Sequence, residues 1–330
     1  MDTAESLKNR VCLVTGGAGF GGSHLCSELI RRGAKVYVYD RCYPENSYLN
    51  FIRIKSKVNC IQGDIRDLDY LKMVITRFEV EFVFHLAAQA IKPQSNYIPY
   101  ETFKVNALGT YNVLEAVRTA KEKPGLVFAS TGGYYGTFFS EALIDENACP
   151  QTGDNIYSAS KVAGDIAVRY YVNTFGIRAA TCRFMQTYGP GDTNFSRLIP
   201  ITVRYLMNAE QPRLSRCDGT PQWDFMHVRD MANAYIKVAE NLDNESVSGE
   251  AFNFGGGKPI SVKELVMLIA KIFTGKEIEP VISVAPKGVL QKTCLDISKA
   301  ESLLGWKPEI GLEQGLEETI TWYRDIWNRI

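Results

Sequence analysis

The chain has 330 residues, 45% of them apolar, and its 37 lysine and arginine residues balance 37 aspartate and glutamate residues. This length predicts one large domain or two lobes with a sizeable core. The zero net charge excludes a general basic surface for nucleic acid, and the apolar runs are too short to span a membrane. The first residues lack the apolar stretch of a signal peptide. Since the eight cysteines form no zinc-like cluster, we expect no metal site, and reduced thiols in a cytoplasmic protein.

Short β-rich runs alternate with helical patterns along the first half of the chain. We expect strands buried on both faces at residues 11–14, 36–39, 58–61, 82–85, 126–130 and 179–183. The spacing of apolar residues predicts helices between them, near residues 22–32, 68–77, 100–119 and 156–174. This alternation predicts an α/β fold with a doubly wound parallel sheet of the Rossmann type.

The pattern weakens after Tyr188, where the glycines and proline of residues 189–191 mark a break. Later helices are expected at residues 198–208, 261–273 and 312–327, with short strands near residue 213 and at 281–284. We therefore predict a first domain of residues 1–188, to which 225–256 return, and a smaller substrate-binding lobe made mainly of residues 189–224 and 257–330. In open α/β sheets the ligand crevice lies at the carboxyl ends of the strands, where such a lobe would close over it.

The sequence TGGAGFGG, at residues 15–22, joins the first strand to the first helix. Gly16 allows a tight turn, Gly19 lets the backbone approach a pyrophosphate, and Gly22 allows close packing of the helix. The helix N-terminus adds free N–H groups and a positive dipole. A plain structural turn could carry the same letters, but the strand, turn, helix and second strand are all present. They predict a nicotinamide dinucleotide site that includes Phe20.

The end of the second strand bears on the choice of dinucleotide. Asp40 ends this strand about twenty residues after the turn, where a carboxylate accepts hydrogen bonds from ribose hydroxyls and repels a 2′-phosphate. This favours NAD over NADP. Arg41 keeps NADP open, because a guanidinium could pair with that phosphate, and the plain alternative for Asp40 is a residue that caps a turn.

Further cofactor contacts are expected after the third and fourth strands. Asp64 is placed to accept from the adenine amino group with Ile65 against the ring, or alternatively this cluster opens the next helix. His85 is expected to be a packed residue rather than a catalyst. Backbone approach to the pyrophosphate and ribose is expected from the residues that follow it, Leu86, Ala87, Ala88 and Gln89.

Tyr157 and Lys161 form the sharpest feature, because residues four apart share one face of a helix. A free phenol titrates near 10, too high for a base at neutral pH. A neighbouring ammonium and a positive nicotinamide ring would favour the phenolate, and Lys161 could also bind the nicotinamide ribose. Ser130 and Thr131 end the fifth strand, where a hydroxyl could hydrogen-bond the reacting substrate oxygen or simply belong to a turn.

In this order, the motifs TGGAGFGG, Asp40, GDIRD, HLAAQ, YSASK and YGPGD resemble those of the extended short-chain dehydrogenases/reductases, and more specifically the nucleotide-sugar epimerases and dehydratases. The resemblance covers nearly the whole chain and includes DISKAESLLGWKP near its end. It implies a tightly held NAD that is reduced and reoxidised within one turnover. Tyr157 would remove the proton from the sugar 4-hydroxyl, Thr131 would share that hydrogen bond, and Lys161 would tune Tyr157.

The resemblance also implies further roles. Asn106 matches a family asparagine near the active-site helix and is expected at the cofactor, although it could be only structural. The helices at residues 100–119 and 156–174 would pack against their copies in a homodimer, as a four-helix bundle. A non-catalytic NAD-binding sensor on the same fold stays as a further alternative, against which the intact Tyr157 and Lys161 pair argues.

The residues after Thr131 separate two reactions. Dehydratases similar to this chain carry an acid/base pair there, because loss of water across C5–C6 needs a base and an acid. Gly132 and Gly133 can do neither, and they would leave room for a 4-keto sugar to turn over. We therefore favour 4-epimerisation over 4,6-dehydration, which stays open because Tyr134, Tyr135, Cys149 or the lobe could supply a base.

The substrate is expected to be a nucleotide-diphosphate sugar, with UDP first and dTDP, CDP and GDP open. Gln186 stands where many relatives have an asparagine, and Trp223 replaces an arginine expected on the diphosphate. Trp223 could instead stack on a base or sugar. The lost guanidinium could be replaced by Arg197, Arg204, Arg213, Arg216, Lys287 or Lys292, among which we take Arg197 and Arg213 as substrate-binding.

Overall fold

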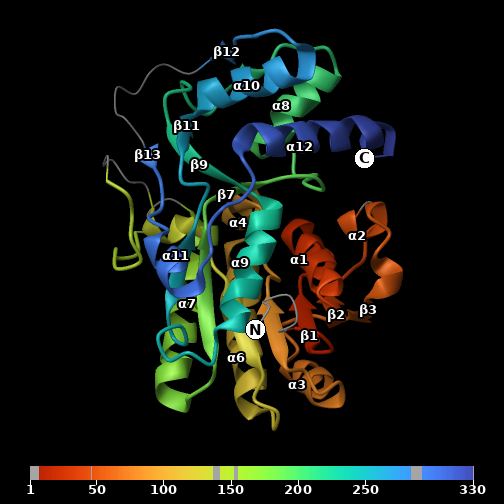
Figure 1. Cartoon of the computed structure of the whole chain (residues 1–330), viewed down its shortest axis with the longest axis vertical. Coiled ribbons are helices and arrows are strands. Elements are labelled where there is room, and N and C mark those ends of the chain that lie inside the picture. The colour runs from red at the N-terminus through yellow and green to blue at the C-terminus, as the bar shows by residue number, and fades with distance from the viewer. Residues whose placement is uncertain (1–6, 46, 137–141, 152–154, 284–291, 330) are drawn as a thin grey trace.

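A computed structural model describes residues 7–45, 47–136, 142–151, 155–283 and 292–329. Its centre is a sheet of seven parallel strands in the order β10-β6-β5-β4-β1-β2-β3 (Figure 1). The order reverses between β1 and β4, which is the switch point where open α/β sheets bind ligands. The strands are β1 (Val11–Thr15), β2 (Lys35–Asp40), β3 (Asn59–Gln62), β4 (Phe82–His85), β5 (Gly125–Ala129), β6 (Ala179–Phe184) and β10 (Ala251–Phe254). This arrangement confirms the predicted fold class.

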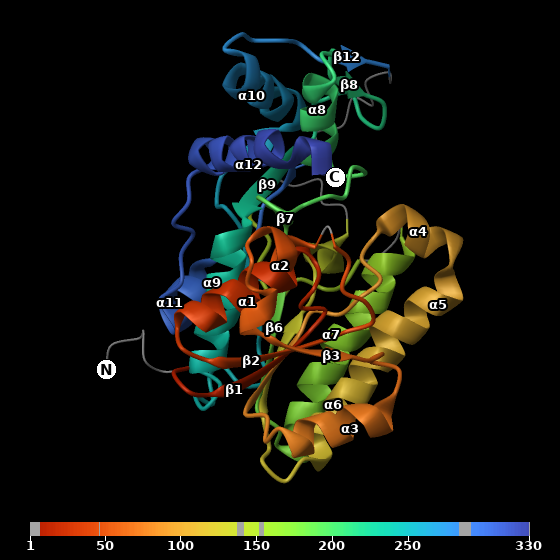
Figure 2. The ribbon, with the colours of Figure 1, turned by 90° about the vertical axis from the view of Figure 1, so that its right-hand side faces the viewer.

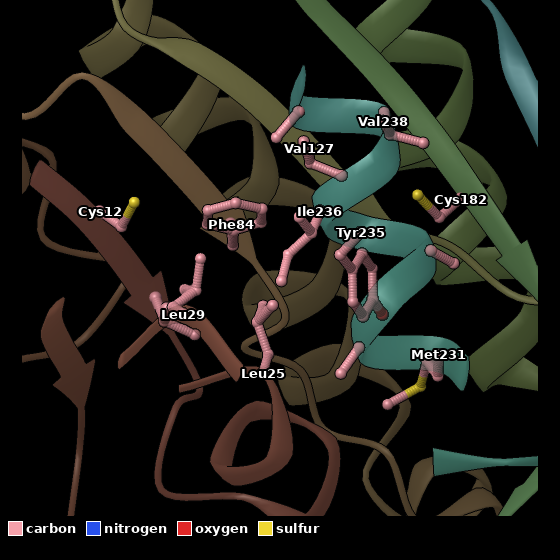
Figure 3. Packing of buried hydrophobic residues seen from close by; sticks show 14 of the residues in the cluster. Cys12, Leu25, Leu29, Phe84, Val127, Cys182, Met231, Tyr235, Ile236 and Val238 are labelled. Carbon is pink, nitrogen blue, oxygen red and sulfur yellow. The ribbon is translucent and has the colours of Figure 1, made fainter. Parts of the chain in front are cut away.

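Helices cover both faces of the sheet (Figure 2). One face carries α1 (Phe20–Arg31), α9 (Val228–Glu240) and α11 (Ser298–Leu304), and the other carries α3 (Leu68–Arg77), α6 (Gly109–Thr119) and α7 (Ile156–Phe175). Figure 3 shows how α1 and α9 bury apolar side chains against the strands. That core includes Leu25, Leu29, Phe84, Val127, Tyr235 and Ile236, all at most 2% exposed.

The lobe lies beyond the carboxyl ends of the strands (Figure 1). Its small sheet has the order β11-β9-β13, with β7 paired to β9, and a separate pair joins β8 to β12. A capping box at Ser261 and Glu264 starts α10, because each side chain satisfies a backbone N–H of the other. The lobe consists of β7 (Gln186–Tyr188), α8 (Leu198–Met207), β8 (Arg213–Leu214), β9 (Gln222–His227), β11 (Pro259–Ser261), α10 (Val262–Thr274), β12 (Val281–Ile282), β13 (Lys292–Thr293) and α12 (Leu312–Ile326).

Two predicted elements differ from the structure. Strand β3 is not buried on both faces, because it is the outer strand of the sheet and three of its four residues are exposed. The single helix predicted for residues 100–119 is divided into α5 (Pro99–Phe103), a π-helical turn η2 (Lys104–Leu108) and α6. The π turn adds one residue to the helical repeat and thereby turns Asn106 toward the neighbouring loop.

Short elements complete the fold. They are α2 (Tyr48–Phe51), η1 (Lys55–Lys57), α4 (Lys92–Tyr97), η3 (Gly132–Tyr135) and η4 (Trp327–Arg329). Within the described ranges, every helix is too short or too polar to cross a lipid bilayer. These residues also contain no group of three or more side chains suited to bind a metal ion.

Candidate active site

A cavity of about 920 Å³ opens at the carboxyl ends of β1, β2, β4 and β5, below the lobe. Its floor includes the glycine turn, and its roof comes from the segment before α8 and from β8 and β9. The cavity therefore lies where the sequence placed the ligand crevice. Every predicted site residue lines it except Gln89 and Asn106.

The glycine turn is shaped for close approach by a ligand. Gly16 has φ +73°, and a Cβ there would lie 2.6 Å from the amide nitrogen of Ala87. A Cβ on Gly22 would collide with the carbonyl oxygen of Gly16. Gly19 is the N-cap of α1, whose first turn carries no acidic side chain. A cradle of free backbone N–H groups at a helix N-terminus fits the pyrophosphate of a dinucleotide.

Asp40 is tied to this turn. Its Oδ2 accepts a hydrogen bond from the backbone N–H of Ala18 at 3.1 Å, and its Oδ1 accepts from Arg41 N at 2.8 Å. Burial raises the pKa of this carboxyl, and these two backbone donors oppose the shift. Arg41 is exposed at the edge of the same cavity. A carboxylate in this place fits the ribose hydroxyls of NAD.

Asp64 and Ile65 line the cavity beyond Asp40. Asp64 receives Arg66 Nη2 at 2.7 Å, and this pairing holds the pKa of Asp64 below its usual range. Helix α3 is capped by Asp67, which accepts from Tyr70 N at 3.0 Å. The two interpretations of this cluster thus fall on different residues: Asp67 caps the helix, and Asp64 faces the cavity.

Asn106 and Gln89 lie behind the cavity wall. The Oδ1 of Asn106 accepts from Gln89 N at 2.7 Å, and its Nδ2 donates to Gln89 O at 3.0 Å and to Ser160 Oγ at 2.9 Å. Asn106 is 1% exposed and holds the loop after β4 against α7. His85 is packed between the hydroxyls of Thr15 and Thr110, as expected.

Tyr157, Lys161 and Thr131 form one wall of the cavity. Asn155 caps α7 by accepting from Ser158 N at 2.7 Å, which sets where the helix starts and therefore which side chains face the cavity. Burial raises the pKa of Tyr157, whereas the charge of Arg197 and a hydrogen bond with the Thr131 side chain lower it.

Lys161 is almost completely enclosed. It is 2% exposed, and its Nζ lies 4.2 Å from the ring centroid of Phe128. Burial lowers its pKa to about 7, and the charge of Asp165 opposes this shift. Lys161 therefore changes its charge near neutral pH, where Tyr157 needs help to ionise.

Gly132 and Gly133 do not leave the free space that the sequence suggested. A Cβ on Gly132 would collide with the sulfur of Met185, and one on Gly133 would collide with Ser158 Oγ. Space for a turning sugar comes from the main cavity instead. Tyr134 and Tyr135 are buried outside its lining, and Cys149 is exposed away from it.

The substrate end of the cavity contains cationic and aromatic groups. Arg197 pairs with the buried Asp192, Nη1 to Oδ2 at 3.0 Å, and its Cζ lies 5.7 Å from the Phe20 ring centroid. Trp223 is half-buried beside Phe225, with ring centroids 6.5 Å apart. Of the cations considered above, Arg197, Arg213 and Arg216 line the cavity, Arg204 and Lys292 do not, and Lys287 lies outside the described residues.

Sequence reasoning missed several lining residues. Asp192 was part of the YGPGD motif but had no assigned role, although a carboxylate next to a candidate arginine was a usable signal. Met185 and Tyr235 also line the cavity. Tyr235 lies within the apolar stripe of α9, so its pattern predicted only a core position.

This chain is similar in sequence to known proteins over nearly its whole length. The family model described as GDP-mannose 4,6 dehydratase matches residues 13–319. A "Putative UDP-glucose 4-epimerase" of Methanocaldococcus jannaschii is 35% identical over 95% of this chain and 98% of its own length. A UDP-glucuronate 4-epimerase of Thermodesulfobacterium geofontis is 29% identical over 95% of this chain and 96% of its own.

Solved structures are similar over the same extent. A Thermotoga maritima UDP-glucose 4-epimerase with UDP-glucose has a TM-score of 0.85 and 29% identity, covering 96% of this chain and 99% of that one. A Bacillus anthracis dTDP-glucose 4,6-dehydratase with NAD has a TM-score of 0.82 and 26% identity, covering 97% and 98%. The chain belongs to the nucleotide-sugar epimerase/dehydratase family of extended short-chain dehydrogenases/reductases, a family that uses NAD.

Proposed function

We propose that this enzyme is a nucleotide-sugar 4-epimerase that acts through a transient 4-keto sugar. The observation that carries the proposal is the single cavity in which Thr131, Tyr157 and Lys161 stand beside the glycine turn. When bound, NAD supplies a reversible two-electron acceptor. The glycine turn would hold its pyrophosphate, Asp40 would accept from the ribose hydroxyls, and Asp64 and Ile65 would contact the adenine.

In this proposal the chain's own residues manage the proton. Tyr157 takes the proton of the sugar 4-hydroxyl, and the Thr131 hydroxyl shares that hydrogen bond. The Lys161 ammonium favours the Tyr157 phenolate, because opposite charges nearby stabilise each other. After the 4-keto sugar has turned its other face, Tyr157 returns the proton.

The surroundings of the two glycines favour epimerisation over dehydration. Acidic side chains at positions 132 and 133 would collide with Met185 and Ser158. The alternative bases near this turn are otherwise engaged, since the Tyr135 hydroxyl donates to Asn253 Oδ1 and the Tyr134 ring stacks on Arg183. Without a second acid/base pair, water is not eliminated from C5–C6.

For the substrate we propose a UDP-sugar. The two relatives described above are named for UDP-sugars. Arg197, Arg213 and Gln186 would bind the sugar-diphosphate part, and Trp223 beside Phe225 offers a flat surface for a ring.

We also propose a homodimer formed by α5, η2, α6 and α7. Large apolar side chains are exposed on these elements, with Tyr100 71%, Tyr170 64% and Leu108 52% exposed, and Tyr97 at the end of the adjoining α4 is 87% exposed. A hollow of about 380 Å³ lies among Tyr100, Phe103, Leu108 and Tyr111. Exposed apolar patches of this kind mark protein interfaces.

The test is incubation of the purified enzyme with UDP-, dTDP-, CDP- and GDP-sugars, followed by mass spectrometry and NMR. A product of unchanged mass with inverted C4 supports the proposal, whereas a product lighter by one water means dehydration. Tyr157→Phe should abolish turnover and leave bound NAD in place. Full activity of that variant would contradict the mechanism, and inertness of the wild type toward the whole panel would favour an NAD-binding sensor.

A further inference from the structure

A buried carboxylate lies behind the catalytic wall. Asp165 follows Lys161 by four residues and Tyr157 by eight, so the three side chains share one face of α7. Its Oδ2 accepts from Ser130 Oγ at 2.6 Å and from Arg183 Nε at 2.9 Å, and its Oδ1 accepts from Arg183 Nη2 at 2.8 Å. Both side chains of this ion pair are 5% exposed.

This ion pair holds the chain on both sides of Thr131. Ser130 is bonded to Asp165, and after Thr131 the η3 turn is held by Arg183. The Cζ of Arg183 lies 3.5 Å from the ring centroid of Tyr134, and its Nη1 donates to the Tyr135 hydroxyl at 2.9 Å. Asp165 and Tyr157 lie on the same helix, α7. The contacts of Asp165 with Ser130 and Arg183 therefore set the distance between Thr131 and Tyr157.

The Asp165 carboxylate also influences the protonation of Lys161 and Tyr157. Along a helix, Asp165 lies about 6 Å from Lys161 and about 12 Å from Tyr157. Its negative charge therefore favours a proton on the lysine more strongly than one on the tyrosine. Three further titratable or charged groups interact electrostatically with this pair. The charge of Lys161 acts on His85 from β4, whereas Tyr157 interacts with Tyr235 from α9 and with Arg197 ahead of α8.

We propose that Asp165 is a positioning residue of this site: it fixes the Thr131 segment against α7 and favours the charged form of Lys161, whose ammonium favours the Tyr157 phenolate. The inference rests on the proposed function only in taking Tyr157 as the base.

The test is an absorbance titration of the tyrosinate in the NAD-loaded enzyme, with the signal of Tyr157→Phe subtracted. In Asp165→Asn the Tyr157 phenolate should form about one pH unit higher. We also expect kcat to fall about tenfold with KM and bound NAD unchanged. The matched control is Glu240→Gln, which removes a buried carboxylate from its ion pair with Arg32 (2.9 Å) outside the cavity lining and should leave the titration in place.

Asp165→Asn leaves Arg183 buried without its counter-charge, so this variant could fail to fold. The double variant Asp165→Asn, Arg183→Met removes both charges and should show a shift in the same direction. A folded variant that titrates like the wild type, or an equal shift in the control, would overturn the proposal. The titration needs no substrate. A wild type that converts no nucleotide sugar would refute the proposed function, while the titration would still decide the role of Asp165.

Discussion

At the scale of single residues, Gly16 has two properties that only glycine allows: a left-handed backbone and a close contact with another segment. Its backbone is left-handed, with φ +73°, and the chain of Ala87 passes directly over it. Gly275, the C-cap of α10, has nearly the same φ of +75° but nothing within 4 Å of its Cβ position. The two glycines therefore separate the effect of backbone strain from the effect of a collision.

Gly16→Ala should release NAD and lower the free energy of unfolding by about 3 kcal/mol, because strain and collision add. Gly275→Ala should cost about 1 kcal/mol, the strain alone, and keep NAD. Cofactor content after gel filtration and urea unfolding measure both effects. Equal losses in the two variants would mean that the close approach to Ala87 has no influence on the cofactor site.

Arg197 is expected to influence both substrate binding and the ionisation of Tyr157. It lines the cavity, and its charge lowers the pKa of Tyr157. Arg197→Ala should raise KM for the nucleotide sugar about 10- to 100-fold, the loss of one charge-assisted hydrogen bond. It should also move the rise of kcat to higher pH, because the phenolate loses a favourable charge. Arg204→Ala, within α8 and outside the cavity lining, is the control and should change neither.

At the scale of elements, the sequence predicted the central strands and the helices of regular period well. Helix α3 was predicted at the residues it occupies, because Asp67 and the apolar period mark its start and length. The edge position of β3 was missed, since a run such as Val58–Ile61 has the same letters in the middle of a sheet. The π turn was also missed; its Asn106 bonds to the backbone of Gln89, which only the tertiary fold brings near.

Prediction of the candidate site had the same limit, since residues in local motifs could be recognised and residues defined by tertiary contacts could not. Tyr157, Lys161, Thr131 and Asp40 could be predicted because their chemistry and spacing are local, and all four line the cavity. Asp165 was not singled out, because only the tertiary fold brings its partners Ser130, just after β5, and Arg183, in β6, to α7.

The helices at the exposed apolar face allow a test of the homodimer. Leu108→Glu introduces a charge at a position that is 52% exposed, which the isolated chain should tolerate. In a dimer the charge would be buried without a partner, so sedimentation should show monomers at micromolar concentration. Leu303→Glu, on the distant α11 and 37% exposed, is the control and should leave the dimer intact. A wild type that sediments as a monomer would rule out this interface.

At the scale of the whole molecule, two buried histidines should make the fold sensitive to acid. His24 Nε2 donates to the Pro190 carbonyl oxygen at 2.7 Å and the ring stacks on Tyr48, and burial lowers the pKa of His24 to about 4. His227 caps α9 near Arg229 and Glu318, and burial lowers its pKa to about 3. Both stay neutral in the folded protein at pH values where the unfolded chain already binds protons.

The free energy of unfolding should therefore be fully retained above pH 6.5 and fall below it, by about 1.4 kcal/mol per pH unit for each histidine. The fall should end near pH 4 for His24 and near pH 3 for His227. Urea unfolding of wild type and His24→Gln between pH 7 and 5 measures this, because the difference between them cancels the other groups. Parallel curves would show that His24 is protonated equally in both states.

The lobe and the sheet domain are joined at several places. Strand β9 pairs within the lobe, yet it continues without a loop into α9 of the sheet domain at His227. The chain crosses again between β6 and β7, between β10 and β11, and on either side of α11. Because the chain passes several times between the lobe and the sheet domain, the lobe cannot be exchanged as one contiguous segment between proteins. Every one of these connections would have to match at the same time. New substrate preferences on this scaffold are therefore expected to arise by point substitutions around the cavity, as at Trp223, and not by recombination of lobes.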